Sequence, residues 1–136
     1  AAACGLAAAD VTRLHADALY RVDMIGFLPG FPFMGDLPAP LRQPRRREPR
    51  LRVPAGAVAV AMGLTAIYPW QSPGGWHLIG RCPVPLFNAR AASPALLAPG
   101  DRVRFAPVTP AELATLEADI TAGRLGADAW LETTDA

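Results

Sequence analysis

The densest group of chemically active side chains is a run of arginines between positions 42 and 52. Arginine presents a planar fork of N–H donors that suits carboxylate and phosphate oxygens. Pro44 and Pro49 stiffen the backbone of this run, and Glu48 is its only acidic residue. The run is therefore a candidate anion site, although a solvated surface would also explain it. Its arginines are Arg42, Arg45, Arg46, Arg47, Arg50 and Arg52.

A second candidate is the glycine-rich stretch "SPGGW", residues 72 to 76. Two consecutive glycines permit positive φ angles, and their backbone N–H groups could then converge into a nest that binds an anion. The alternative is a hairpin turn with packed tryptophans, which needs no ligand. Aromatic walls and hydrogen-bonding groups would come from Tyr68, Trp70, Gln71, Ser72 and Trp76.

Three other features are weaker indicators of a site. The stretch "GFLPGFPFMG", residues 26 to 35, predicts either a hydrophobic corner or the apolar wall of a pocket or subunit interface. Pro54-Ala55-Gly56 predicts a turn into a buried strand. His15 falls in a predicted helix and His77 at the head of a predicted strand, where either could be an ordinary hydrogen-bonded histidine.

The elements that must position these side chains are mostly short strands. Residues 20–27 alternate, with Tyr20, Val22 and Met24 on one face, and predict a strand. The proline-rich stretch 28–41 predicts a loop or a sheet edge, because proline cannot donate to a central ladder. Later strands separated by Gly/Pro turns favour an antiparallel barrel or sandwich. They are "GAVAVAM", "TAIYPW", "WHLIG", "VPLF" and "DRVRFAPV".

A helix is predicted near each end of the chain. The first covers about residues 10–20 with Asp10 as its N-cap. In the second, Thr109 is the N-cap, Pro110 the first helical residue, and Glu112 completes a capping box. The alanine-rich opening looks like the tail of a preceding helix, so we expect the chain to begin within a longer protein.

Composition excludes several classes of function. All 13 basic residues are arginine, so the chain lacks the lysine of a P-loop, a Schiff-base enzyme, a biotin carrier or a Ser-Ser-Lys amidase. The net charge of +1 argues against a general nucleic-acid binder. Cys4 and Cys82 lie far apart, which implies neither a zinc site nor a disulfide framework. No apolar run is long enough to cross a bilayer.

Four motifs stand in an order and at intervals that resemble one protein family. They are "GFLPGFPFMGDLP", "PRRREPRLRVPAGAVAVA", "TAIYPWQSPGGWHLIGRCP" and "LLAPGDRVRFAPV". The chain resembles the family of allophanate hydrolase subunit 1, also named the 5-oxoprolinase B subunit, with carboxyltransferase subdomains C and D and a sporulation-kinase inhibitor among its members. The resemblance implies a mainly β fold, a cyclophilin-like antiparallel β-barrel with flanking helices over residues 25–136. Residues 1–24 would be the remnant of a small α/β N-terminal domain.

The resemblance also implies a cytoplasmic subunit of an ATP-dependent hydrolase that opens the lactam 5-oxoproline to glutamate. ATP would act at the level of the complex, with no metal or biotin on this chain, and the isolated chain would be inactive. Its partners would be a homologous carboxyltransferase A/B-type subunit (the 5-oxoprolinase C subunit, or allophanate hydrolase subunit 2) and a lactam-binding subunit. We expect a small anionic substrate, and we expect binding to neither nucleic acid nor membrane.

The candidate site combines the arginine run with the glycine-rich stretch. Arg45 and Arg50 would neutralise charge, and the amides of Gly74 and Gly75 would stabilise a developing oxyanion. The partner would supply the general base, with His15 as a candidate in this chain. We expect catalytic roles for His15, Arg50, Tyr68 and Ser72. We expect ligand contacts from Arg45, Pro54, Gly56, Gln71, Pro73, Gly74, Gly75 and Trp76.

Two alternatives stay open on the sequence. One is a non-catalytic protein that binds and inhibits a sporulation-type histidine kinase. Ala57 and Leu64 favour it, because they stand where the family usually has a hydroxyl and an amide. The other is part of a biotin-dependent urea carboxyltransferase. Prolyl isomerisation rests on analogy of fold alone.

Overall fold

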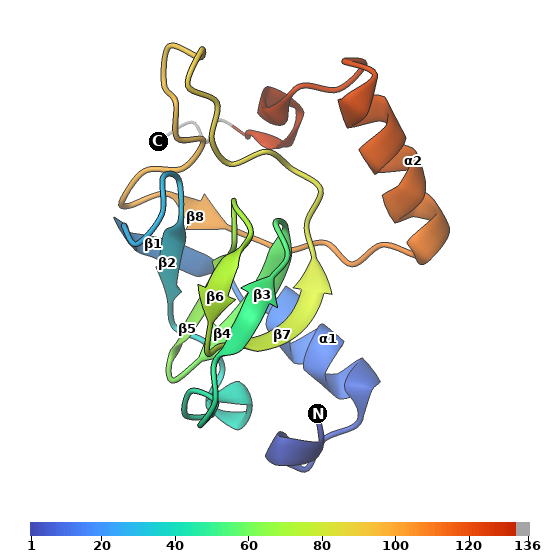
Figure 1. Cartoon of the computed structure of the whole chain (residues 1–136). Coiled ribbons are helices and arrows are strands. Elements are labelled where there is room, and N and C mark those ends of the chain that lie inside the picture. The colour runs from blue at the N-terminus through green and yellow to red at the C-terminus, as the bar shows by residue number, and fades with distance from the viewer. Residues whose placement is uncertain (133–136) are drawn as a thin grey trace.

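A six-stranded antiparallel sheet forms the centre of the molecule. The computed structural model describes residues 1–132. The strands of the sheet follow the order β7-β4-β5-β2-β1-β8 (Figure 1). In chain order they are β1 (Tyr20–Ile25), β2 (Pro32–Gly35), β4 (Ala57–Ala61), β5 (Leu64–Ile67), β7 (His77–Arg81) and β8 (Arg102–Val103).

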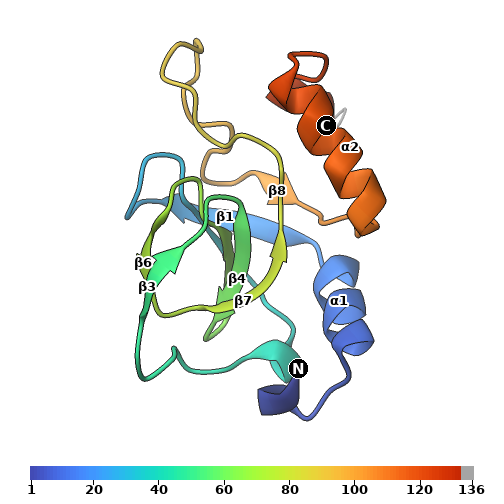
Figure 2. The same cartoon turned by 45° about the vertical axis from the view of Figure 1, so that its right-hand side comes forward.

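A second sheet lies across the face of the first. It is a two-stranded antiparallel ribbon of β3 (Arg50–Val53) and β6 (Ser72–Gly74) (Figures 1 and 2). Within residues 1–132 the two sheets stay separate. The mainly β, antiparallel prediction is therefore confirmed, whereas the closed barrel is not.

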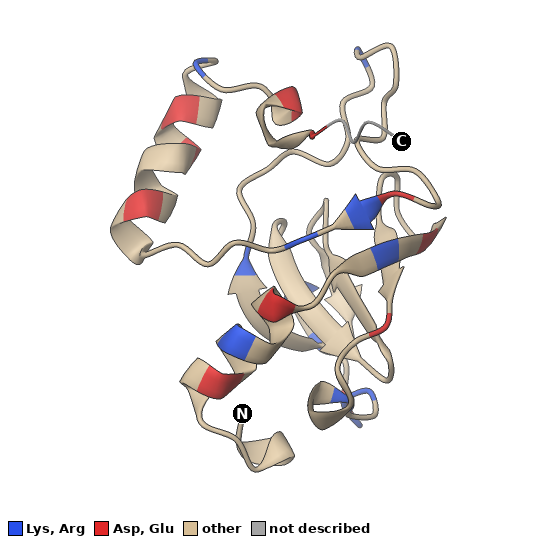
Figure 3. Ribbon diagram, turned by 180° about the vertical axis from the view of Figure 1, so that it is seen from behind, with Lys and Arg blue, Asp and Glu red and all other residues tan. Residues whose placement is uncertain are grey.

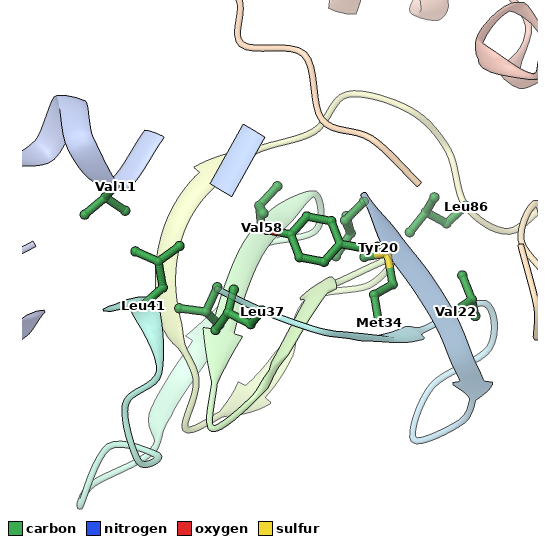
Figure 4. Close-up of a cluster of buried hydrophobic side chains, with 10 residues drawn as sticks. Val11, Tyr20, Val22, Met34, Leu37, Leu41, Val58 and Leu86 are labelled. Carbon is green, nitrogen blue, oxygen red and sulfur yellow. The ribbon is translucent and has the colours of Figure 1, made fainter. Parts of the chain in front are cut away.

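The sequence of β4 explains why the central sheet has two different faces. All five residues of "AVAVA" are buried, and alternate side chains along a strand point to opposite faces. Val58 and Val60 join a valine-side core with the aliphatic and aromatic side chains drawn in Figure 4. The alanines join an aromatic core on the other face, where their small side chains leave room for large rings. The buried residues of the aromatic core are Phe31, Val53, Ala57, Ala59, Ala61, Ala66, Tyr68 and Trp76.

The β1–β2 region departs from the sequence prediction in two ways. Met24 does not share a face with Tyr20 and Val22: they are fully buried, while Met24 is 51% exposed. A register irregularity between Val22 and Met24 breaks the alternation. The expected loop or edge at residues 28–41 also proves wrong in part, because β2 pairs with both β1 and β5. Pro32 is tolerated there because it is the first residue of its strand.

Two α-helices flank the sheet. Helix α1 (Ala8–Asp17) buries Val11 and His15 against the valine-side core, and its N-cap is Ala7 rather than Asp10. Helix α2 (Pro110–Thr121) begins at the predicted capping box, where the Thr109 hydroxyl accepts from the Glu112 amide at 3.2 Å. Single 3₁₀ turns cover Ala2–Cys4, Ala39–Leu41 and Ala127–Trp130.

Between β7 and β8 the chain forms a long excursion. The expected strand "VPLF" is wrong: this segment contributes only an isolated bridge between Phe87 and Ala95. The predicted domain boundary between residues 24 and 25 falls inside β1, and the division itself stays a prediction. In the part of the chain that the structure describes, no helix has the length and apolar character needed to span a bilayer.

Candidate active site

Three hydrogen bonds to backbone atoms hold the start of the arginine run against the end of the central sheet. The Gln43 carbonyl accepts from the Met62 amide at 2.6 Å. His77 Nε2 donates to the Pro44 carbonyl at 2.8 Å. The Arg46 amide donates to the Gly75 carbonyl at 2.7 Å. These hydrogen bonds therefore hold the start of the arginine run beside the glycine-rich stretch.

The ribbon continues this alignment. Arg50 in β3 is the cross-strand partner of Gly74, and Val53 is the partner of Ser72, with a register irregularity between them. Arg45 and Arg46 also lie beside Gly75, since a side chain at position 75 would approach them to within 3.9 Å. The structure thus brings Arg45, Arg50 and the glycine pair together, as the sequence predicted.

The run carries positive charge without ionic partners. Among residues 1–132 the ion pairs are Arg13–Asp10, Arg81–Glu117 and Arg124–Asp119, and none involves positions 42–52. Arg42 Nε donates to the Leu37 carbonyl at 3.0 Å. The Nη1 atom of Arg46 is buried and has no hydrogen-bond partner in the described structure. An arginine-rich surface of this kind attracts anions.

Beneath the ribbon lies the aromatic core. Phe31 packs edge-on against Tyr68 and Trp76, with ring centroids 5.0 and 6.2 Å away. Phe33 contacts the same group, 4.8 Å from Phe31. Phe27 instead is mostly exposed, at the tip of the β1–β2 loop. The predicted hydrophobic corner at residues 26–35 therefore becomes one side of a packed core.

Tyr68 and Trp76 lie under the ribbon and not in an open mouth. Tyr68 is 1% exposed and Trp76 5% exposed. Burial raises the pKa of the Tyr68 hydroxyl, and the nearby charge of Arg45 opposes that rise. Tyr68 therefore stays a neutral group at physiological pH. Its catalytic role, like the ligand contact of Trp76, remains a prediction, and both side chains are almost fully buried.

The glycine-rich stretch does not form the expected nest. Positive φ angles occur at five glycines of the described chain, and neither Gly74 nor Gly75 is among them. Ser72-Pro73-Gly74 is instead an extended strand paired with β3. The expected nest of positive-φ glycines is therefore wrong, and the ligand contacts of Gly74 and Gly75 stay predictions.

The other residues of this stretch contact neighbouring backbone or solvent and do not gather around one site. Ser72 donates to the Pro73 carbonyl at 3.1 Å, and Gln71 and Pro73 are exposed. Trp70 does not wall the same site as Trp76. Its indole donates to the Pro29 carbonyl at 3.0 Å, and its ring packs against Phe87 at 5.9 Å.

The turn at Pro54-Ala55-Gly56 lies at a different place. Gly56 has a φ of 87°, donates to the Tyr68 carbonyl at 2.6 Å and accepts from the Cys82 amide at 2.7 Å. A cavity of about 290 Å³ opens beside it, lined also by Arg81 and by residues of α2. Pro54 and Gly56 are therefore placed near this cavity and away from the Gly74–Gly75 pair.

His15 belongs to the opposite face of the central sheet from Tyr68. Thr65 donates to the Ala59 carbonyl at 3.0 Å, so its oxygen accepts from His15 Nε2 at 2.9 Å. The His15 ring also packs 4.5 Å from Phe105. Burial lowers its pKa to about 4, which keeps the ring neutral. The structure thus does not bring His15 together with the arginines.

For two residues that the sequence analysis names, the contact partners were not predicted. His77 holds the Pro44 carbonyl, and Arg46 bonds Gly75 through its backbone. Their types gave no signal of these roles, because both contacts join segments distant in sequence. Among residues 1–132, no cluster of three or more His, Cys, Asp or Glu side chains could hold a metal ion.

Comparison with known proteins identifies the family. The family described as carboxyltransferase domain, subdomain C and D, matches residues 1–97. The chain belongs to this family. The resemblance expected from the four motifs is thereby confirmed.

Individual relatives agree with this assignment. The chain is 50% identical to the 5-oxoprolinase B subunit of Escherichia coli O157:H7 over 107 residues, which are 79% of this chain and 49% of the relative. It is 48% identical to the Haemophilus influenzae protein of the same name over 95 residues, 70% of this chain and 45% of the relative. The chain thus spans about half the length of these curated relatives.

The fold is also found in a solved structure. The conserved uncharacterized protein PH0987 from Pyrococcus horikoshii superposes with a TM-score of 0.78 and 44% identity. The match covers 82% of this chain and 52% of the archaeal chain.

Proposed function

We propose that this carboxyltransferase C/D chain is part of a subunit of an ATP-dependent 5-oxoprolinase. The observation that carries the proposal is its 48–50% identity to two proteins named as B subunits of 5-oxoprolinase. In this proposal the chain acts with a homologous carboxyltransferase A/B-type subunit and a lactam-binding subunit. ATP belongs to the complex, and the complex works in the cytoplasm.

The arginine run supports an anion-binding role in that complex. Ring opening of 5-oxoproline by water produces glutamate, and ATP hydrolysis drives it, so every species on the path carries a carboxylate or a phosphate. Arg45 and Arg50 hold such a group at the ribbon, where no acidic side chain of the described structure pairs with them. Charge-assisted hydrogen bonds of this type are among the stronger polar contacts.

The proton-transferring group comes from a partner subunit. His15 is neutral, buried and on the other face of the sheet, and Tyr68 is a weak acid under the ribbon. This chain therefore contributes binding and charge neutralisation to the reaction.

The test is ATP-dependent conversion of 5-oxoproline to glutamate by the full-length protein reconstituted with both partner subunits. Omission of this subunit abolishes turnover. Arg45→Ala and Arg50→Ala each lower kcat/KM about 10- to 100-fold, the effect of losing a hydrogen bond to a charged group. Arg90→Ala is the matched control, because Arg90 is an exposed arginine in the 88–94 loop.

One result would overturn the proposal, and a second would overturn only the location of the anion site. A correctly assembled complex without turnover would reject the 5-oxoprolinase assignment and leave binding to a histidine kinase as the function to test. Full activity in both arginine variants would remove the anion site from the arginine run while keeping the assignment of the subunit.

A further inference from the structure

The cavity of about 290 Å³ lies between α2 and the β-structure, apart from the arginine run. It is lined by the Ala55–Gly56 turn and by Tyr68-Pro69. The segment 81–86 and the α2 residues Glu117, Ile120 and Thr121 complete the lining. Its volume is at the lower limit of small-molecule sites, about 300 Å³, so it suits a compact ligand.

An ion pair joins the end of β7 to α2 at this cavity. Arg81 Nε at the end of β7 lies 2.7 Å from Glu117 Oε1 on α2. The Oε1 atom is buried, yet it makes no well-aligned hydrogen bond within residues 1–132. The contact is therefore mainly a charge–charge attraction and not a directional hydrogen bond. With side-chain exposures of 63% and 34%, such a pair is weak.

Helix α2 is held loosely against the sheet. None of its residues is buried. Its acidic residues are Glu112, Glu117 and Asp119, and it has no basic residue (Figure 3). Figure 2 shows the helix standing beside the β-structure at the end of an extended connection. A ligand that competes with Glu117 for Arg81 therefore disturbs little packing.

We propose that this cavity binds a small carboxylate through Arg81, and that Glu117 competes with the ligand for the same guanidinium. A guanidinium offers five N–H donors, and a carboxylate can take two of them in parallel. Glu117 Oε1 approaches Nε of Arg81 without a well-aligned hydrogen bond, so a free carboxylate can make the better-aligned contact. Thr121 lines the cavity and adds a hydroxyl. The site goes beyond the proposed 5-oxoprolinase function, because it needs neither ATP nor a partner subunit.

The experiment measures binding to the full-length protein alone, by calorimetry and by amide chemical shifts. The probes are 5-oxoproline and 2-pyrrolidinone, which is the same lactam without the carboxylate. We expect 5-oxoproline to bind and to shift the amides of Gly56, Cys82 and Thr121. We expect 2-pyrrolidinone to bind at least tenfold more weakly, since it cannot pair with Arg81.

Three variants test the competition. Glu117→Gln removes the competing charge and strengthens 5-oxoproline binding about two- to fivefold. Arg81→Gln weakens it about 10- to 100-fold. Asp119→Asn is the matched control, because Asp119 lies on the same helix and pairs with Arg124 at 2.8 Å, outside the cavity lining. The control leaves the affinity unchanged.

Any of four results overturns the inference. Equal binding of the two lactams would show that the carboxylate is not recognised. Amide shifts confined to Gly75 and its neighbours would place 5-oxoproline at the arginine run. Absence of saturable binding would mean that the cavity does not bind 5-oxoproline. Weaker binding to a folded Glu117→Gln variant would make Glu117 a ligand contact instead of a competitor. Turnover by the assembled complex is independent of these results, so the two proposals fail separately.

Discussion

The Tyr68 hydroxyl occupies the space that a side chain at position 74 would fill. An alanine Cβ built at Gly74 would collide with this hydroxyl and lie 3.0 Å from the Cζ atom of the Tyr68 ring. Gly74 is therefore required by close packing of the ribbon on the aromatic core and not by a positive φ angle. This packing couples β6, which ends at Gly74, to the Tyr68 ring beneath it.

Gly74→Ala should lower the free energy of unfolding by about 1–3 kcal/mol, the cost of overpacking a well-filled core. Gly75→Ala is the control. Its nearest neighbours would lie 3.8 and 3.9 Å away, so it should change stability by less than about 1 kcal/mol. Urea denaturation measures both. Adding Tyr68→Phe to Gly74→Ala should restore part of the lost stability, because it removes the colliding hydroxyl. Similar free energies of unfolding for Gly74→Ala and Gly75→Ala would contradict the packing argument.

His77 should keep the arginine run in place. His77→Phe keeps a flat ring but loses the donor to the Pro44 carbonyl. The neighbouring bond from the Arg46 amide to Gly75 should then open more often, and the Arg46 amide should exchange with solvent about fivefold faster. Hydrogen exchange followed by NMR measures this rate. His77→Gln retains a donor and should show a smaller effect; equal exchange in all three proteins would mean that His77 does not restrain the run.

His15 should make the fold sensitive to mild acid. Burial lowers its pKa from the ordinary value of 6.5 to about 4. Between these values the unfolded chain binds a proton that the folded chain does not, so stability falls as the pH falls. The free energy of unfolding should drop by up to about 3 kcal/mol across this window and lose nothing more from His15 below it.

Denaturation of the wild-type protein and of His15→Gln at several pH values between 7 and 4 tests this dependence. Glutamine can still donate to Thr65, but it does not titrate. The variant should show a slope shallower by about one proton at the centre of the window. Identical slopes would mean that His15 takes up its proton in the folded state.

Local features of the sequence were enough to predict the start of α2 and most of the strands. The capping pair Thr109 and Glu112 depends only on contacts within one helical turn, and β4 is marked by its own hydrophobic residues. Pro32 led to the wrong prediction of a loop or sheet edge. The central place of its strand, β2, depends on pairing with β1 and β5. Such pairings bring together segments that no local pattern connects.

The candidate site shows the same difference between local motifs, which the sequence reveals, and contacts between distant segments, which it does not. The arginine run and the glycine pair were each visible as motifs, and their proximity follows from the pairing of Arg50 with Gly74. The need for glycine at position 74 was not predictable, because it comes from the ring of Tyr68, which follows β5. Likewise, nothing local in α2 indicates that Glu117 meets Arg81 across a cavity.

Gly56, expected from sequence to contact a ligand, should prove essential for stability before any ligand is considered. Its φ of 87° is costly for an L-residue, and an added Cβ would lie 2.7 Å from the Cys82 carbonyl. Gly100 is the matched control, since its φ is 93° and a Cβ there would meet nothing within 4 Å. Gly100→Ala should cost about 1–2 kcal/mol from backbone strain alone.

Gly56→Ala should exceed that cost by about 1–3 kcal/mol, because the Cys82 backbone must also move. Urea denaturation of the two variants gives the difference directly. Gly56 both donates to Tyr68 and accepts from Cys82, so this movement should also reshape the cavity beside α2. Equal losses for the two variants would show that backbone conformation alone requires glycine at position 56, and that the turn has room for a side chain.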